Sequence, residues 1–94
     1  MKQPVVYILS SKRKVTLYIG VTSALIKRIW EHRNGVEGFT MNYNVHQIVY
    51  YELYDSMDDT IIRKRQLKKW NRAWKIRLIK QSYPKWSDLY KDIL

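Results

Sequence analysis

Hydrophobic and polar positions along the chain fall into blocks, and three of these blocks predict short strands. The segments VVYILS (5–10), VTLYIGV (15–21) and HQIVYYELY (46–54) are rich in β-branched and aromatic residues, which favour strands. The first segment is apolar almost throughout, and this predicts a strand that is buried on both faces. Because only SKRK (11–14) separates the first two segments, we expect them to pair antiparallel.

Three other blocks have the spacing of helices. Apolar residues recur at helical intervals in ALIKRIWEHRN (24–34), where Thr22 or Ser23 can cap the helix. The segment 56–81 predicts one long helix, with Ser56 as its N-cap and acidic residues in its first turn. The segment 87–94 predicts a short terminal helix capped by Ser87. The stretch 36–44 has no clear period and is expected to form a loop.

The resulting order, β-β-α-β-α-α, predicts an α+β fold in which helices flank a small three-stranded antiparallel sheet. The length of 94 residues fits a single domain spanning residues 1–94. The chain has no cysteine, which excludes disulfides and thiolate metal sites and agrees with the cytoplasmic location that we expect. No apolar stretch reaches transmembrane length, so we expect no membrane partner.

Charge changes this picture, because the net charge is +10 and the basic residues are clustered. Residues 61–80 hold nine Lys or Arg and no acid. On a continuous helix, four of them follow i, i+4, i+8 and i+11 and form one basic stripe: Lys64, Lys68, Arg72 and Lys75. A solvated helix face normally mixes charges of both signs. We therefore interpret the stripe as a ridge that contacts the phosphates of nucleic acid.

The same long helix carries a separate apolar stripe formed by Leu67, Trp70, Trp74 and Leu78. At this spacing, tryptophans are expected to pack in the core instead of stacking on bases. Because the apolar stripe is then needed for the core, binding of this helix to a membrane surface is the least favoured reading.

A second set of residues with chemical potential surrounds the first predicted helix. Arg28 and His32 are four residues apart and share a helix face. Tyr18 lies near the end of the strand that leads into this helix, and Tyr7 lies on the neighbouring strand. Gly20 indicates a close approach of the backbone to another group or a bend. An arginine can hold a phosphate, a histidine can transfer a proton near neutral pH, and a tyrosine can position water, so this set suits phosphodiester chemistry.

The sequence resembles the GIY-YIG nucleases, in particular their small stand-alone bacterial members, nearly from end to end. VVYIL resembles the first motif segment, with Val5 and Val6 in the places of Gly and Ile, and LYIG carries the second motif. The remaining matching segments follow in the same order: GVTSALIKRIWEHRNG, FTMNYNVHQIVYYE, IRKRQLKKWNRAWKIRLI and PKWSDLY.

The resemblance implies metal-dependent cleavage of one DNA strand with a single Mg²⁺ or Mn²⁺ ion and no small-molecule cofactor. We expect DNA as the partner, with branched or flapped forms among the candidate substrates. By the resemblance, Tyr7 and Tyr18 are the motif tyrosines, one of which activates or orients water. Arg28 matches the arginine that clamps the phosphate, and His32 matches the histidine with an acid–base or supporting role.

The chain departs from this family at the metal ligand. The family has a glutamate in a stretch similar to REKQLK, where this chain reads RKRQLK (63–68) and places Lys64 at the glutamate position. A charged lysine has no lone pair and cannot coordinate Mg²⁺. Near the end of the chain, Tyr83-Pro84 stands where the family often has Asn-Pro.

Three functions therefore remain open: an active or residually active nuclease, a catalytically silent nucleic-acid-binding domain, and a protein-interaction module. For the first two, we expect both phenols, Arg28, His32 and the Lys64 ammonium to converge on one cationic pocket.

Overall fold

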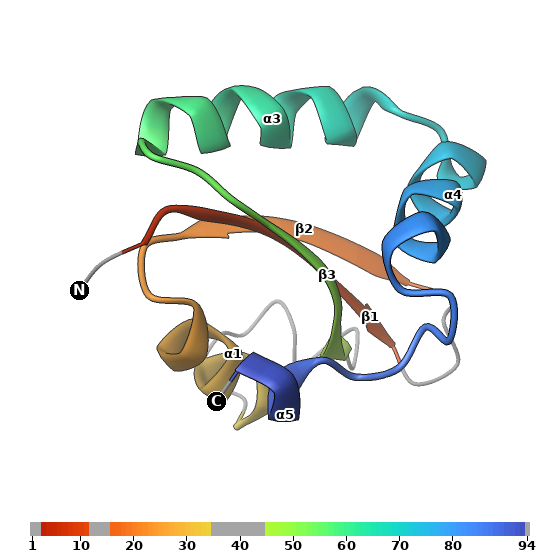
Figure 1. Ribbon diagram of the computed structural model, residues 1–94, viewed down its shortest axis with the longest axis horizontal. Helices are drawn as coiled ribbons and strands as arrows, with labels where there is room; N and C mark the ends of the chain where they lie inside the picture. Colours follow the sequence, from red (N-terminus) through yellow and green to blue (C-terminus); the bar gives the residue numbers. More distant parts are fainter. Residues whose placement is uncertain (1–2, 12–15, 35–44, 94) are drawn as a thin grey trace.

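A three-stranded antiparallel sheet forms the centre of the protein in a computed structural model that describes residues 3–11, 16–34 and 45–93. The strands are β1 (Val5–Ser11), β2 (Leu17–Thr22) and β3 (Val45–Leu53), and they lie in the order β2-β1-β3 (Figure 1). The predicted strands and the antiparallel pairing of the first two are confirmed. The central strand β1 is buried along its whole length, as its continuous apolar run predicts.

Helices cover both faces of this sheet, which confirms the predicted α+β fold. On one face lie α1 (Leu25–Arg33) and the short α5 (Tyr90–Ile93), and on the other lie α3 (Met57–Lys69) and α4 (Arg72–Ser82) (Figure 1). The loop predicted at 36–44 lies outside the described residues. Among the helices that the structure describes, none is both long and apolar enough to cross a membrane.

The core consists of two clusters because alternate residues of β1 point to opposite faces. Val6 and Ile8 pack with residues of α3 and α4 such as Leu67 and Ile79. Val5, Tyr7 and Leu9 pack with Ile29 of α1 and with Leu89 near the C-terminus. The first cluster is mainly aliphatic and also holds Tyr50 and Trp86, whereas the second holds the buried phenol of Tyr7.

The prediction of one long helix over 56–81 is wrong, because the chain turns between Lys69 and Arg72. Trp70 has an extended backbone conformation, with ψ of 146°, and ends α3. The side chain of Asn71 accepts a hydrogen bond from the backbone N–H of Trp74 at 2.9 Å and so caps α4. An Asn in an otherwise helical segment was the sequence signal for this break.

The caps of the other helices agree in part with the predictions. Ser56 accepts a hydrogen bond from the N–H of Asp59 at 3.2 Å, which confirms it as the N-cap of α3. The predicted cap of α1 by Thr22 or Ser23 is wrong, because Ala24 is the N-cap residue and makes no side-chain cap hydrogen bond, and Thr22 instead accepts from the N–H of Ala24 just before the helix. The terminal helix begins at Tyr90 instead of residue 87, and Asp88, not Ser87, accepts its first N–H.

Candidate functional site

Tyr7, Tyr18 and His32 form a compact cluster on the α1 face of the sheet. The Tyr7 hydroxyl and His32 Nε2 are 3.0 Å apart and share a hydrogen bond. The ring centroids of Tyr18 and His32 are 5.4 Å apart, and those of Tyr7 and Tyr18 are 6.3 Å apart. The strands bring the phenols together because Leu9, two residues after Tyr7, pairs with Tyr18, so both tyrosines lie on one face.

Gly20 makes room for this cluster. It pairs with Tyr7 across β1 and β2, and a Cβ atom at position 20 would lie 2.5 Å from both Cζ and the hydroxyl oxygen of Tyr7. The close backbone approach predicted for Gly20 is therefore confirmed. The absence of a side chain at this position lets the Tyr7 ring approach β2 closely while its hydroxyl reaches His32.

The two phenols differ in their access to solvent. Tyr7 is 1% exposed and His32 is 2% exposed, so this hydrogen-bonded pair is buried. Tyr18 is only partly buried, as is Arg28, which lies one helical turn before His32 on α1. A bound group can thus approach Tyr18 directly. Tyr7 and His32 lie behind Tyr18, and their role is to hold its ring in place.

A cleft of about 270 Å³ lies beside Tyr18 at the edge strand β2. Leu17, Tyr18 and Ile19 line it on the strand side, and Lys68 of α3 and Lys75 of α4 line it on the helix side. The break between α3 and α4 turns both lysines toward the same opening. Two ammonium groups beside the edge of β2 form a suitable environment for a phosphate group, while the ring of Tyr18 packs with His32 on the α1 face.

The basic stripe of the sequence analysis is therefore only partly realised. Lys68 and Lys75 meet at the cleft, but Arg72 is the exposed first residue of α4 and does not continue a helix from Lys68. Lys64 is half-buried on α3, where burial and the charge of Lys68 lower the pKa of its ammonium group. The apolar stripe is wrong at Trp74, which is 51% exposed.

The expected convergence of five side chains is also incomplete. Tyr7, Tyr18 and His32 are in contact, and Arg28 shares the helix of His32. Lys64, however, belongs to α3, which packs on the opposite face of the sheet from α1 (Figure 1). Helical spacing predicts which residues lie on the same side of α3. It does not predict which face of the sheet α3 covers.

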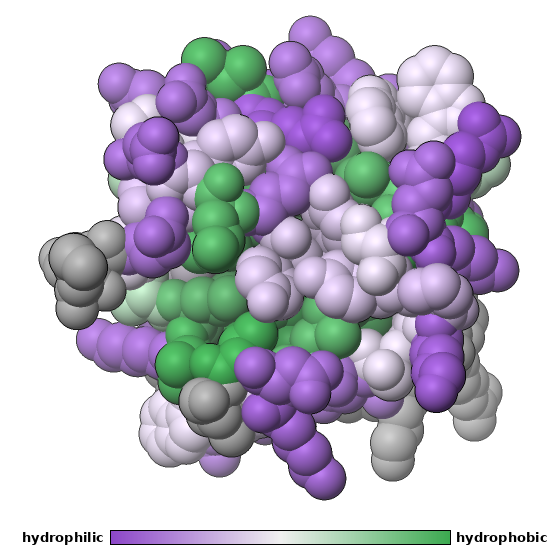
Figure 2. All heavy atoms as spheres, in the orientation of Figure 1, coloured by the Kyte–Doolittle hydropathy of each residue, from purple (hydrophilic) through white to green (hydrophobic). Residues whose placement is uncertain are grey.

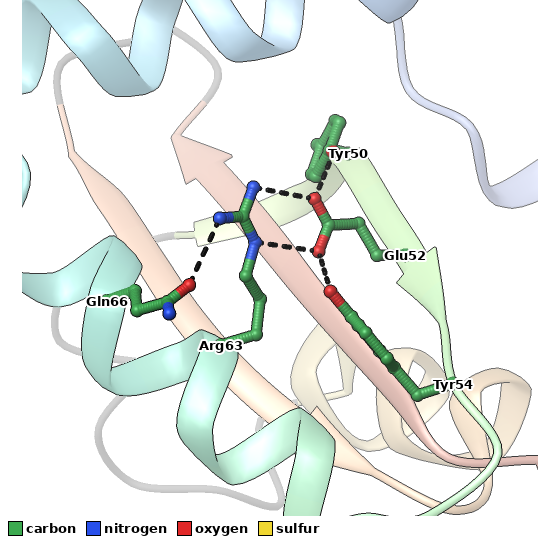
Figure 3. Close-up of polar contacts among 5 residues, drawn as sticks. All are labelled: Tyr50, Glu52, Tyr54, Arg63 and Gln66. Carbon is green, nitrogen blue, oxygen red and sulfur yellow. Dashed lines mark hydrogen bonds and ion pairs between the residues drawn. The ribbon is translucent and has the colours of Figure 1, made fainter.

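Glu52 and Arg63 form the main polar network between β3 and α3 (Figure 3). Arg63 donates from Nε at 3.0 Å and from Nη2 at 3.1 Å to the two carboxylate oxygens of Glu52. The hydroxyls of Tyr50 and Tyr54 donate to the same carboxylate. Arg63 also donates to Gln66 and lies over the ring of Trp70 at 5.1 Å. The network therefore fixes α3 on the sheet, and with it the position of Lys68.

The pKa values of this network follow from its contacts. Burial alone raises the pKa of the Glu52 carboxyl, but the hydrogen bonds from Arg63, Tyr50 and Tyr54 outweigh it and leave the pKa below its usual value. Burial and the Glu52 carboxylate raise the pKa of Tyr50 and of Tyr54. The hydrogen bond to Glu52 raises the pKa of Arg63. Glu52 is thus a carboxylate with all its partners inside the protein.

The donor set does not fit the divalent metal ion that the family resemblance implies. The ligand position holds Lys64, which has no lone pair while charged. Glu52 is engaged by Arg63, and Asp88 is engaged by Arg33 and by the N–H of Ile48. Over residues 3–11, 16–34 and 45–93, no group of three or more His, Asp or Glu side chains is placed to hold a metal ion.

Tyr83, at the position where the family often has an asparagine, belongs to an aromatic cluster at the β3 side. Its ring stacks on that of Tyr51 at 6.3 Å and meets that of Tyr50 edge-on at 6.2 Å. Burial and the phenol of Tyr51 raise the pKa of Tyr83. The residue therefore closes the core at this position instead of supplying an amide.

A larger groove of about 410 Å³ lies elsewhere, between the start of α1, the end of β3 and the C-terminal helix. Its lining is mainly apolar, with Leu25, Leu53 and Ile93 among the residues, and Lys27 is the cation among its described lining residues. Apolar side chains gather over this region in Figure 2, whereas hydrophilic side chains predominate, among some apolar ones, over α3 and α4. The cationic cleft is therefore the better place for a phosphate.

A three-stranded sheet with paired phenols on neighbouring strands, followed by a helix with an arginine and a histidine, defines a small nuclease-type α+β domain. The chain belongs to the GIY-YIG family, because the GIY-YIG catalytic domain matches residues 3–77. The family relationship makes this a nuclease-like protein whose substrate class is nucleic acid. No solved structure shows a significant match to the chain.

Three bacterial relatives carry the name UPF0213 protein. The protein of Syntrophus aciditrophicus is 39% identical over 84 residues, covering 87% of this chain and 95% of the relative. That of Clostridium perfringens is 34% identical, covering 94% and 95%, and that of Staphylococcus saprophyticus is 30% identical, covering 86% and 99%. The chain is thus similar to small proteins over nearly their whole length.

Proposed function

We propose that this GIY-YIG domain binds DNA through the backbone, with a phosphate in the cleft between Tyr18, Lys68 and Lys75, and that its hydrolytic activity is impaired or lost. The observation that carries the proposal is the cleft itself. It places two ammonium groups from different helices beside the edge strand β2 that carries Tyr18. A net charge of +10 adds a long-range attraction for any polyanion.

The residues of the cluster would orient the backbone in this complex. The Tyr18 hydroxyl can donate a hydrogen bond to a phosphate oxygen, and its ring is held by His32 at 5.4 Å. Tyr7 and His32 are buried and hydrogen-bonded to each other, so they hold the Tyr18 ring in position. On the α1 side of the sheet, Arg28 is the candidate for a bidentate contact with a neighbouring phosphate of the same strand.

The impairment follows from Lys64. An ammonium group can neutralise phosphate charge, but it cannot hold a divalent ion or lower the pKa of a bound water as such an ion does. Neither Glu52 nor Asp88 is available as a substitute, because Arg63 and Arg33 hold them. Fold and backbone binding do not depend on a metal ion, so both persist without hydrolysis.

Replacing both cleft lysines by glutamine should weaken DNA binding and flatten its salt dependence. We expect the Lys68→Gln/Lys75→Gln variant to lose about tenfold in affinity at low salt, and the slope of log K against log salt to fall by about 1.5–2, since each phosphate contact contributes about 0.9. Fluorescence anisotropy with labelled duplex and flapped DNA over a salt series measures both quantities.

The matched control is Lys85→Gln/Lys91→Gln, which removes the same charge from exposed lysines outside the cleft. We expect this control to keep most of the slope. Equal effects of the two double variants would mean that DNA binding depends on the overall charge of the protein, which would contradict the proposed cleft. Absence of salt-dependent binding in the wild type would favour the protein-interaction module.

A carboxylate at position 64 should permit metal-dependent cutting if Lys64 is the cause of the loss and if bound DNA passes from α3 around the edge strand β2 to Tyr18 and Arg28. We expect the wild type to leave nicked, flapped and branched DNA intact in Mg²⁺ or Mn²⁺, and Lys64→Glu to cut with either ion. Gel assays of labelled strands measure this, with Lys64→Glu/Arg28→Ala as the control that should not cut. Cutting by the wild type that Arg28→Ala abolishes would contradict the proposed impairment.

A further inference from the structure

Trp74 is a large aromatic side chain that the fold leaves open to solvent. It lies in the first turn of α4 and is 51% exposed, although its neighbour Trp70 packs against the core. The two indole rings meet edge to face, with centroids 5.9 Å apart. Arg63 lies over the ring of Trp70 and holds it in place. Trp74 is therefore presented on a fixed support rather than on a mobile segment.

A cavity of about 180 Å³ opens beside this ring. Trp70, Trp74 and Leu78 form its apolar walls, and Arg77 and Gln81 add polar groups. Pockets for drug-sized ligands have roughly 300–1,000 Å³, so this cavity suits a single planar ring system. A guanidinium and an amide beside an aromatic wall suit the edge of a nucleobase, which carries both donors and acceptors.

The position of the cavity relative to the phosphate cleft narrows the choice of ligand. Trp74 and Lys75 are consecutive on α4, and Lys75 lines the cleft with Lys68 and Tyr18. Residues 61–80 contain no acidic side chain, so nothing in this segment repels an anion that passes from one opening to the other. A strand whose phosphate occupies the cleft would bring its neighbouring base to the tryptophan.

We infer that the cavity at Trp74 binds an unpaired nucleobase of the strand whose backbone lies in the cleft, and that the domain therefore prefers single-stranded or flapped DNA to a closed duplex. This inference rests on the proposed nucleic-acid function and adds a base subsite to it. Stacking on an aromatic ring does not distinguish one base from another. The subsite therefore selects for unpaired bases without selecting for a particular base.

The test compares two oligomers of equal length and charge: oligothymidylate and the same backbone made of abasic residues. We expect the wild type to bind oligothymidylate about tenfold more tightly, because stacking of one base contributes a factor of this order. The Trp74→Ala variant should bind both oligomers equally, at the affinity that the wild type has for the abasic one. Trp74→Phe should retain most of the preference.

The control variant is Trp30→Ala, since Trp30 is 52% exposed on α1 and lies outside both openings. It should keep the preference for bases, and circular dichroism checks that each variant is folded. Equal binding of both oligomers by the wild type would overturn the base subsite and leave the backbone cleft intact. Binding of neither oligomer would overturn the proposed function itself. A preference that persists in Trp74→Ala would place base recognition elsewhere.

Discussion

Replacing Gly20 by alanine should destabilise the domain by about 2–3 kcal/mol, the cost of inserting a methyl group into a packed core. The new Cβ would lie 2.5 Å from Cζ of Tyr7, and this ring has no free space because it is 1% exposed. The ring must move away from β2, which stretches or breaks its hydrogen bond with His32. For a domain of this size, we expect the melting temperature to fall by about 10 °C.

Urea unfolding of Gly20→Ala, measured in the wild type and in Tyr7→Phe, separates this clash from a general effect of the substitution on the strand. In Tyr7→Phe, the hydroxyl oxygen is absent, so one of the two closest contacts disappears and the substitution should cost less. An equal loss of unfolding free energy in both backgrounds would show that the Tyr7 hydroxyl is not what excludes a side chain at position 20. A Gly20→Ala variant as stable as the wild type would contradict the packing described for Tyr7.

The sheet and the phenol cluster were predictable from the sequence because both depend on short-range rules. A continuous apolar run marks the central strand β1, and a four-residue spacing places Arg28 and His32 on one face of α1. A short connection forces β1 and β2 to pair, and the pairing then brings Tyr7 and Tyr18 to the same face. These features need no knowledge of how distant elements pack.

The structure of the basic region was less predictable. The directions in which its lysines and tryptophans point depend on where α3 ends and on which face of the sheet α3 and α4 cover. A break of two residues at Trp70 and Asn71 turns the second half of the segment, which exposes Trp74 and brings Lys75 to the cleft of Lys68. If the helical periodicity of α3 is continued through that break, the residues of α4 are assigned to the wrong sides of the helix. The separation of Lys64 from the α1 face depends on packing between elements, which helical spacing does not encode.

Replacing Glu52 by glutamine should lower the free energy of unfolding by about 2–3 kcal/mol at neutral pH, because Arg63 then loses a charged partner in a largely buried site. The side chains of Glu52 and Arg63 are 17% and 22% exposed, so water replaces the lost contact only in part. The variant should also loosen α3, since this network is what fixes Arg63 to β3 (Figure 3). Urea titration monitored by circular dichroism measures the loss.

The pH dependence of unfolding tests the same contact independently. The pKa of Glu52 is lower in the folded protein than its usual value of about 4.3, so its stabilising effect is complete above that value and is lost as the pH falls through the folded pKa. Wild-type stability should therefore decline more steeply below about pH 4.3 than that of Glu52→Gln, and the difference between them should shrink in acid. Asp55→Asn, which removes an exposed carboxylate outside this network, is the matched control. A wild type and Glu52→Gln with parallel acid profiles would mean that Arg63 does not stabilise the Glu52 carboxylate in the folded state.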